Sequence, residues 1–337
     1  MRDITKKQTK RKPHSKKHTA AIAAVPLLLL AVDLAAGNYM IGFSLRRKKP
    51  TSKPVGPPPA TSEETRKLVD ANAKRLTEQT MAWHDSAAIE TVGLRSDDGL
   101  HLAGEIIPHP GGGHRWAIVV HGYAGDRTWM YNFAHIWAEQ GYNILLPDLR
   151  AHGESEGEYI GMGWEDRLDL LKWIALVCER DPQAQIILHG VSMGSATVMM
   201  TAGEALPPQV KAVVEDCGYT SVWDIFSDEM KNLFHMPAFP VLHTADLLYS
   251  LRTKRSFRNA SALEQLKQAT VPILFLHGGK DSFVRTSMVY ELYDVCPTKK
   301  ALYVAPDAGH GESLYIAPEI YKEKVFGFMR DILPDES

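Results

Sequence analysis

Gly190-Val191-Ser192-Met193-Gly194 is the stretch of this sequence that decides the fold. It follows a short apolar run, residues 185–188, and opens a helix-like run, residues 193–206. A strand that turns at once into a helix lifts a serine hydroxyl above the edge of a sheet, and flanking glycines avoid collisions in that turn. The pattern therefore predicts Ser192 as a nucleophile, whereas the alternative is a plain helix N-cap, a role that serine often fills.

Outward from this turn, apolar strand-like runs alternate with helix-like runs. Upstream, Asp97-Asp98-Gly99 separates two strand-like stretches and is typical of a hairpin. The expected strands are residues 89–95, 100–107, 116–120, 142–146, 185–188, 210–214, 271–276 and 301–304, and the expected helices are 61–83, 164–179, 193–206, 284–295 and 316–332. A hairpin followed by repeated strand–helix units predicts an α/β protein with a mostly parallel, eight-stranded sheet flanked by helices.

Residues 219–267 interrupt this alternation. The segment is long for a connection and rich in methionine and aromatic side chains. We interpret it as a helical cap over the carboxyl edge of the sheet. Such side chains more often pack against one another than bind a substrate, but a position over the site favours both uses.

Two further residues are expected at the same sheet edge as Ser192. Asp281 lies in a loop after the strand 271–276, and His310 lies in a loop after the strand 301–304. A serine hydroxyl needs a base, and the base needs an acid to orient it. The order Ser192, Asp281, His310 therefore predicts a catalytic triad. Asp307 and Asp216 are alternative acids.

An oxyanion formed during acyl transfer requires two N–H donors. We expect one from the backbone of Met193, which follows the nucleophile, and one from Tyr123, in the loop after the strand 116–120. Substrate-pocket residues are expected nearby, and the candidates are His121, Gly122, Trp164 and Phe226.

Composition limits the other functions open to the chain. Of its 337 residues 45% are hydrophobic, which is enough for a large core, and the formal net charge of −2 disfavours a nucleic-acid binder. Cys178, Cys217 and Cys296 are widely separated and odd in number, so neither a disulfide framework nor a zinc spacing is present and no metal site is expected.

The N-terminal region has a different character from the rest. Residues 1–18 are strongly basic, residues 19–45 are largely apolar, and residues 46–60 form a Pro-rich linker before a domain over 61–337. The apolar stretch is long enough to cross a bilayer, although Asp33, Asn38 and Pro26 interrupt it. It predicts a transmembrane signal anchor with a cytoplasmic tail and an extracytoplasmic catalytic domain, or else a cleaved signal peptide and a secreted protein.

Residues 89–329 resemble the α/β-hydrolase family, especially its monoacylglycerol-lipase-like and serine-aminopeptidase-like branch, including bacterial members with an N-terminal membrane segment. The matching stretches are His121-Gly-Tyr-Ala-Gly125, Pro147-Asp-Leu-Arg-Ala-His-Gly-Glu-Ser155, Gly190-Val-Ser-Met-Gly194, Gly278-Gly-Lys-Asp281 and Ala308-Gly-His310. The resemblance implies hydrolysis of an ester or related acyl bond of a small molecule through an acyl-enzyme, without a cofactor.

Two other functions stay open. A peptidase-like amidase would need acidic residues that hold a substrate amine, for which Glu215, Asp224, Asp228 and Glu229 are candidates. A catalytically inactive, membrane-tethered binding protein could use the same fold, but it would have no need of an intact Ser, Asp and His set. The substrate's identity and the oligomeric state are not encoded in any pattern of this sequence.

Overall fold

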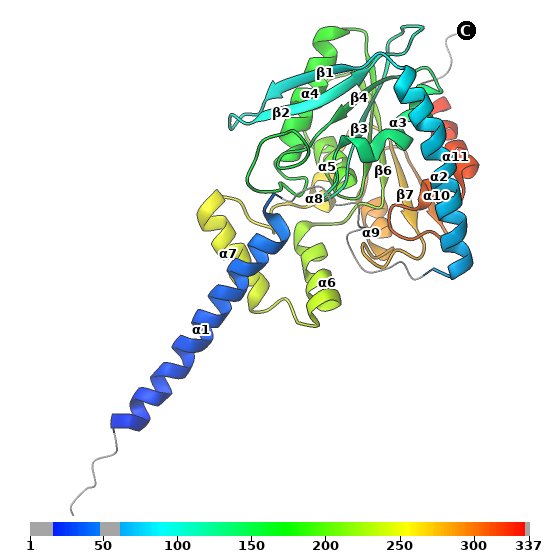
Figure 1. The fold of residues 1–337 in the computed structure, drawn as a ribbon. Helices are drawn as coiled ribbons and strands as arrows, with labels where there is room; N and C mark the ends of the chain where they lie inside the picture. The colour runs from blue at the N-terminus through cyan, green and yellow to red at the C-terminus, as the bar shows by residue number, and fades with distance from the viewer. Residues whose placement is uncertain (1–15, 48–60, 334–337) are drawn as a thin grey trace, which may run out of the picture.

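An eight-stranded sheet forms the centre of the protein (Figure 1). The computed structural model describes residues 16–47 and 61–333, so most of the basic tail and of the Pro-rich linker lies outside the described residues. The strands follow the spatial order β1-β2-β4-β3-β5-β6-β7-β8. Their bounds are β1 Glu90–Arg95, β2 His101–Ile107, β3 Arg115–Val120, β4 Asn143–Pro147, β5 Gln185–Val191, β6 Val210–Asp216, β7 Ile273–Gly278 and β8 Lys300–Ala305.

The sheet is antiparallel at one end and parallel over the rest, which confirms the expected fold. β1 pairs with β2 and β2 with β4 in antiparallel fashion, and every later pair is parallel. Alternate residues of β3 enter two different apolar clusters, Ile118 in one and Val119 in the other. The central strands are therefore covered on both faces, as expected for parallel strands with nearly continuous apolar runs.

Helices cover both faces of the sheet. One core cluster takes in α4 Asp166–Arg180, α5 Met193–Ala202 and α9 Ser287–Val295, and the other takes in α2 Glu63–Ser86, α3 Tyr131–Ala138 and α11 Pro318–Arg330. The short helix α3, which follows a turn of 3₁₀ helix at Arg127–Met130, was not expected from the sequence. Its eight residues are too few for a helical period to stand out from its surroundings.

The segment 219–267 folds as three helices, α6 Val222–Phe234, α7 Val241–Thr253 and α8 Ala262–Leu266. In Figure 1, α6 and α7 project from the carboxyl edge of the sheet, while α8 returns to it and packs against α5. Serines cap two of these helices: Ser221 accepts from the Asp224 N–H, and Ser261 accepts from the Glu264 N–H.

The apolar N-terminal stretch is one helix, α1 Lys16–Leu45, that runs alongside α7 (Figure 1). Its residues Pro26–Leu45 are long and apolar enough to cross a membrane by length and composition. The polar residues that interrupt the stretch face the cap, because Asp33 accepts a hydrogen bond from Thr244 and Asn38 accepts one from Arg252 at 2.7 Å. The short α10 Ser313–Ile316 completes the fold.

Candidate active site

Ser192 lies at a sharp turn between β5 and α5. Its backbone angles are φ 58° and ψ −118°, a region that non-glycine residues rarely adopt, and its N–H donates to the Asp216 carbonyl at 2.8 Å. A side chain at Gly190 would lie 2.2 Å from the Gly194 carbonyl oxygen, and one at Gly194 would lie 2.1 Å from the Val120 carbonyl oxygen. Both flanking glycines are therefore required by close backbone contact.

The structure brings Ser192, His310 and Asp281 into one hydrogen-bonded chain. His310 Nε2 is 2.8 Å from Ser192 Oγ, and His310 Nδ1 is 2.8 Å from Asp281 Oδ2. The other oxygen of Asp281 accepts the backbone N–H groups of Phe283 and Val284, both at 2.9 Å. This geometry allows the serine to pass its proton to the imidazole while the carboxylate orients the ring.

The surroundings of Asp281 favour its charged form. Burial alone would raise the pKa of this carboxyl group, but the adjacent His310 and His277 hold its pKa below the ordinary value. His277 Nε2 is 2.9 Å from the Val284 carbonyl oxygen and 3.4 Å from Asp281 Oδ2. Although burial works in the opposite direction, the contact with Asp281 raises the pKa of His277. His277 therefore stabilises the charged form of Asp281.

Neither alternative acid is hydrogen-bonded to His310 among the described residues. Asp307 is exposed, and among the described residues no hydrogen bond joins it to His310. Asp216 is fully buried at the end of β6, where burial raises the pKa of its carboxyl group to about 6. The hydrogen bonds of His310 run instead to Asp281 and Ser192.

The loop that contains Tyr123 lies directly beside the nucleophile. A side chain at Gly122 would come within 3.2 Å of Ser192 Cβ, so only glycine lets the backbone approach this closely. Met193 is the first residue of α5, where backbone N–H groups have no partner within the helix. The backbones of Tyr123 and Met193 thus flank Ser192, in the region where the two expected donors are needed.

Two buried histidines hold this loop. His121 Nε2 accepts the Leu149 N–H at 3.0 Å, and its Nδ1–H therefore donates to the Gly122 carbonyl at 2.8 Å. His152 Nε2 accepts the Ala124 N–H at 3.2 Å. Burial lowers the pKa of both histidines, to about 3 for His152, so both are neutral at physiological pH. His121, which was expected to line the substrate pocket, is not among the residues that line the cavities at Ser192, and both of its ring nitrogens are hydrogen-bonded to backbone groups.

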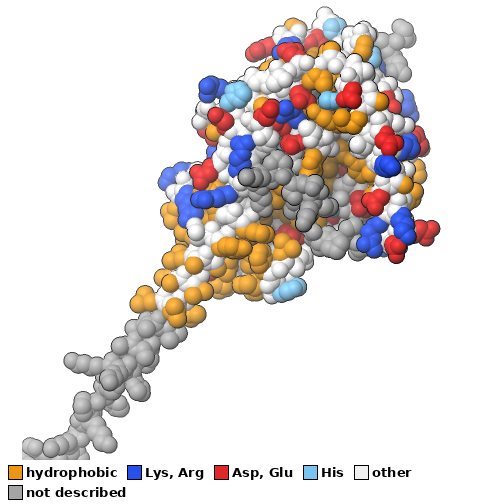
Figure 2. Space-filling view, viewed as in Figure 1, with side chains coloured by type: hydrophobic (Ala, Val, Ile, Leu, Met, Phe, Trp, Pro, Cys, Tyr) orange, Lys and Arg blue, Asp and Glu red, His pale blue; other side chains and the backbone are white. Residues whose placement is uncertain are grey.

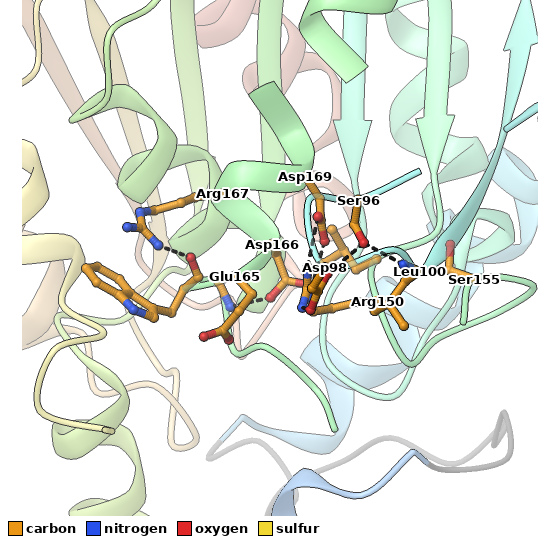
Figure 3. Close-up of polar contacts among 12 residues, drawn as sticks. Ser96, Asp98, Leu100, Arg150, Ser155, Glu165, Asp166, Arg167 and Asp169 are labelled. Carbon is orange, nitrogen blue, oxygen red and sulfur yellow. Dashed lines mark hydrogen bonds and ion pairs between the residues drawn. The ribbon is translucent and has the colours of Figure 1, made fainter. Parts of the chain in front are cut away.

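The loop that carries His152 is fixed in turn by a buried charge network (Figure 3). Arg150 is only 4% exposed and donates to both oxygens of Asp169, at 2.8 and 2.9 Å, and to both oxygens of Asp98, at 3.0 and 3.2 Å. On the same loop, Ser155 Oγ donates to the Asp148 carbonyl at 2.6 Å and accepts the Ala103 N–H at 2.9 Å. The stretch 147–155 therefore has a structural role beneath the site.

Two cavities meet at Ser192. The first has a volume of about 350 Å³ and lies on the side of Ser192 where His310 is. Its lining is Gly122, Tyr123, Trp129, Met130, Phe133, Val191, Ser192, Ser282, Phe283, His310, Gly311, Glu312 and Tyr315. The second, about 260 Å³, lies on the side of Met193 and is almost entirely apolar. Its lining is Met40, Phe43, Ser44, Tyr123, Met162, Ser192, Met193, Tyr219, Ile225, Phe226, Glu229, Met230, Leu233, Phe234 and Phe283.

The expected pocket residues do not all line the same cavity. Gly122 lines the first cavity and Phe226 lines the second. Trp164 lines neither: its ring stacks under the Arg167 guanidinium at 3.6 Å, and it borders a different hollow beside Leu45. The structure therefore does not bring Trp164 together with the other expected pocket residues. Helix α4 begins only at Asp166, so Trp164 belongs to the turn before the helix.

One group of potential metal ligands coincides with the triad. Atoms of Cys217, Asp281 and His310 lie within 4.8 Å of one another. Burial raises the pKa of the Cys217 thiol well above its ordinary value, so it stays protonated, whereas zinc binds the thiolate. The donor set therefore suits an acid–base pair better than a metal centre.

Of the four acidic residues considered for amine binding, only Glu229 lines a cavity at Ser192. Asp228 is paired with Arg285 at 2.8 Å, Asp224 accepts the hydroxyl groups of Thr220 and Ser221, and Glu215 is fully buried against Ser195. Burial and the neighbouring Asp228 raise the pKa of Glu229 to about 7.

Comparison with known proteins agrees with this architecture. A family model described as serine aminopeptidase, S33, matches residues 114–239. The uncharacterized protein YqkD of Bacillus subtilis is 27% identical over 213 residues, which cover 63% of this chain and 70% of YqkD. The uncharacterized protein Rv2307c of Mycobacterium tuberculosis is 23% identical over 310 residues, which cover 91% of this chain and 95% of the relative.

Among solved structures, the esterase Pf2001 of Pyrococcus furiosus superposes with a TM-score of 0.60 at 22% identity, covering 84% of this chain and 100% of that one. The fold is therefore that of the α/β hydrolases, and the comparisons support a hydrolase enzyme of this class.

Several residues that build the site were not singled out from the sequence. His152 and Arg150 lie within the stretch 147–155, but nothing in its spacing indicates that His152 binds the Ala124 backbone or that Arg150 binds Asp169. Phe283 borders both cavities, and only its position two residues after Asp281 places it near the site. Met40 and Phe43 lie in the apolar N-terminal stretch, whose expected role was membrane insertion.

Proposed function

We propose that the protein is a serine esterase that cleaves carboxylic esters through an acyl-enzyme. Ser192 attacks the carbonyl carbon while His310 Nε2 accepts the hydroxyl proton. Asp281 holds the ring and stabilises its charged form. The hydrogen-bonded chain from Asp281 through His310 to Ser192, located at the strained turn, is the observation that carries this proposal.

The second half of the reaction uses the same groups. His310 returns the proton to the leaving alcohol, and water then attacks the acyl-enzyme with His310 again acting as base. Backbone N–H groups of Tyr123 and Met193 bind the oxyanion in both steps, in a site from which surrounding apolar residues exclude water.

A serine aminopeptidase or related amidase is the second candidate, favoured by the description of the matching family and by Glu229 in the second cavity. An amine clamp needs a carboxylate that is charged at neutral pH. The raised pKa of Glu229 works against that, and the rest of the cavity lining is apolar. Esters are therefore the preferred substrates in this proposal, and rates on p-nitrophenyl esters and aminoacyl p-nitroanilides separate the two.

The decisive test is Ser192→Ala. Loss of the nucleophile in another triad enzyme reduces turnover on the order of 10⁶-fold, so hydrolysis of p-nitrophenyl butanoate and labelling by a fluorophosphonate probe should both disappear. Ser227→Ala is the matched control, because that hydroxyl donates only to the Trp223 carbonyl of its own helix. Wild-type turnover in Ser192→Ala would refute the nucleophile, and absence of labelling in the wild-type chain would favour an inactive binding protein.

We also propose that α1 is a retained membrane anchor and that the catalytic domain lies outside the cytoplasm. The end of the helix is part of the folded domain: Ile41 is 2% exposed and Leu45 is 1% exposed. Cleavage of a signal peptide after Ala36 would leave these residues in place, but it would remove Asp33, which accepts a hydrogen bond from Thr244 of the cap. Labelling of Ser192 in membranes washed with alkaline carbonate tests the anchor, and labelling of intact cells by an impermeant probe tests the orientation. A labelled protein found only in the soluble fraction would contradict the anchor.

A further inference from the structure

The end of α1 meets the active-site loop directly. Tyr123 Oη donates to the Ser44 carbonyl at 2.8 Å, so the side chain of an expected oxyanion-loop residue rests on the last turn of the helix. Just beyond it, Arg47 donates to the carbonyls of Ser155 and Gly153 at 2.6 and 2.7 Å. The helix end is thus tied to the same loop that holds His152.

The helix also borders the second cavity. Met40, Phe43 and Ser44 line it together with α6 and with Ser192 itself. Phe43 packs edge-on against Phe234 of α6, with ring centroids 5.8 Å apart. Further along, a side chain at Gly37 would lie 3.0 Å from the Ala245 backbone nitrogen, so α1 and α7 are in close contact. These contacts fix the helix as one wall of the cavity.

The chemistry of the triad assigns each cavity a role. The leaving alcohol must receive a proton from His310 Nε2, so it belongs in the first cavity, which His310 lines. The acyl chain then extends into the second cavity, where His310 is absent from the lining and apolar side chains predominate. Burying each methylene of a chain in such a cavity is favourable by about 0.8 kcal/mol.

The mouth of the second cavity opens at an apolar surface. Two of its lining residues, Phe43 and Leu233, are 41% and 46% exposed. Exposed apolar side chains continue from there along α1 and over the cap, and Figure 2 shows an apolar surface at the base of the protruding helix. These side chains are Leu27, Leu28, Leu29, Leu30, Val32, Leu34, Tyr39, Met236, Phe239, Leu247 and Leu251.

We infer that the last two turns of α1 form a wall of the acyl-chain cavity, so that Met40 and Phe43 select a long acyl chain. This inference rests on the proposed esterase function and adds to it a substrate class, long-chain acyl esters. The helix is then part of the site that determines specificity as well as an anchor.

The test compares p-nitrophenyl dodecanoate with p-nitrophenyl butanoate, using the full-length chain in detergent. Met40→Trp fills the cavity, and the ratio of kcat/KM for dodecanoate to that for butanoate should fall about tenfold or more, since a few methylenes in an apolar pocket are worth this much. Leu30→Trp, on the same helix but outside the cavity, should leave the ratio unchanged. Phe43→Ala removes part of the wall without adding bulk and should lower the ratio by about threefold.

A binding measurement keeps this inference separate from the esterase proposal. In the Ser192→Ala background, a fluorescent fatty acid such as cis-parinaric acid should bind, and Met40→Trp should weaken that binding. If the kcat/KM ratio of dodecanoate to butanoate were unchanged in both cavity variants, with hydrolysis still dependent on Ser192, the inference that α1 forms a wall of the acyl-chain cavity would be refuted. If Met40→Trp weakened fatty-acid binding but neither ester was hydrolysed in a Ser192-dependent way, the esterase function would be refuted and the role of α1 as a cavity wall would be supported.

Discussion

The two cavities that meet at Ser192 are built from different parts of the molecule. The first is lined by loops at the carboxyl edge of the sheet and by the short helices α3 and α10, with His310, Glu312 and Tyr315 among its polar groups. The second is lined by α1 and α6, which are added to the sheet from the N-terminus and from an insertion, and Glu229 is its one ionisable carboxyl group. In the proposed reaction, the groups that break the bond therefore belong to the frame of strands and their connections, whereas many of the groups expected to contact the acyl chain belong to the added helices.

The largest effect should come from the sheet edge. In Asp281→Asn, the amide oxygen can keep the Phe283 and Val284 N–H groups, which turns the amide NH₂ toward His310 Nδ1. The ring must then carry its proton on Nε2 and cannot accept the serine proton. Turnover of every ester should fall about 10⁴-fold, as in other triads with the wrong tautomer.

Asp307→Asn is the control for this prediction, because Asp307 is exposed and not hydrogen-bonded to His310 among the described residues. Its kcat should match that of the wild-type chain, whatever the length of the acyl chain. If Asp281→Asn kept more than about a tenth of the rate, another carboxylate would have to be the acid, and the first cavity would lose its assigned chemistry.

A smaller effect, on stability, should follow from Arg150→Met. The substitution leaves Asp169 buried without its cation, and breaking a buried ion pair in this way costs about 3–5 kcal/mol. Arg180→Met is a matched control, since Arg180 makes a similar bidentate contact with Glu90 at the surface. Surface ion pairs contribute about 0–1 kcal/mol to the free energy of unfolding. Free energies of unfolding from urea titrations check this, and equal losses in the two variants would contradict a structural role for the network.

The sequence predicts the sheet edge much better than the added helices. A glycine-flanked serine between strand and helix, and loops after two later strands, are local patterns, and the parallel sheet brings their ends together. The sequence does not reveal where α1 lies, because an apolar run is equally compatible with lipid and with protein contact. Asp33 and Asn38 weaken the membrane pattern in the sequence, and their bonds to Thr244 and Arg252 depend on a packing that spacing does not encode.

The misplaced pocket residues have a related cause. His121 and Trp164 lie close to site residues along the chain, but adjacent side chains in a loop can point in opposite directions. His121 turns inward to satisfy backbone groups that would otherwise be buried without a partner. Trp164 turns toward Arg167. Proximity in sequence therefore indicates which loops lie near the site but not which way each side chain in them points.

The smallest predicted effect concerns Glu229 in the second cavity. Burial, aided by Asp228, raises its pKa from 4.5 to about 7, so the folded chain holds this proton over a pH range in which the unfolded chain has released it. The contribution of this group to stability therefore decreases as pH rises from about 4.5 to about 7, and stays at its lowest above that range. Above about pH 7 a negative charge then faces the acyl chain.

The kcat/KM ratio for dodecanoate over butanoate should accordingly decrease a few-fold between about pH 6 and about pH 8, because a charged carboxylate beside the cavity disfavours an apolar chain. Glu229→Gln removes the titration and should flatten this profile, while Asp228→Asn, whose carboxylate is paired with Arg285 outside the cavity, should keep a downward slope. A wild-type profile that is flat, or one that still falls in Glu229→Gln, would mean that the chain does not pass Glu229 and that the second cavity is not where substrates are selected.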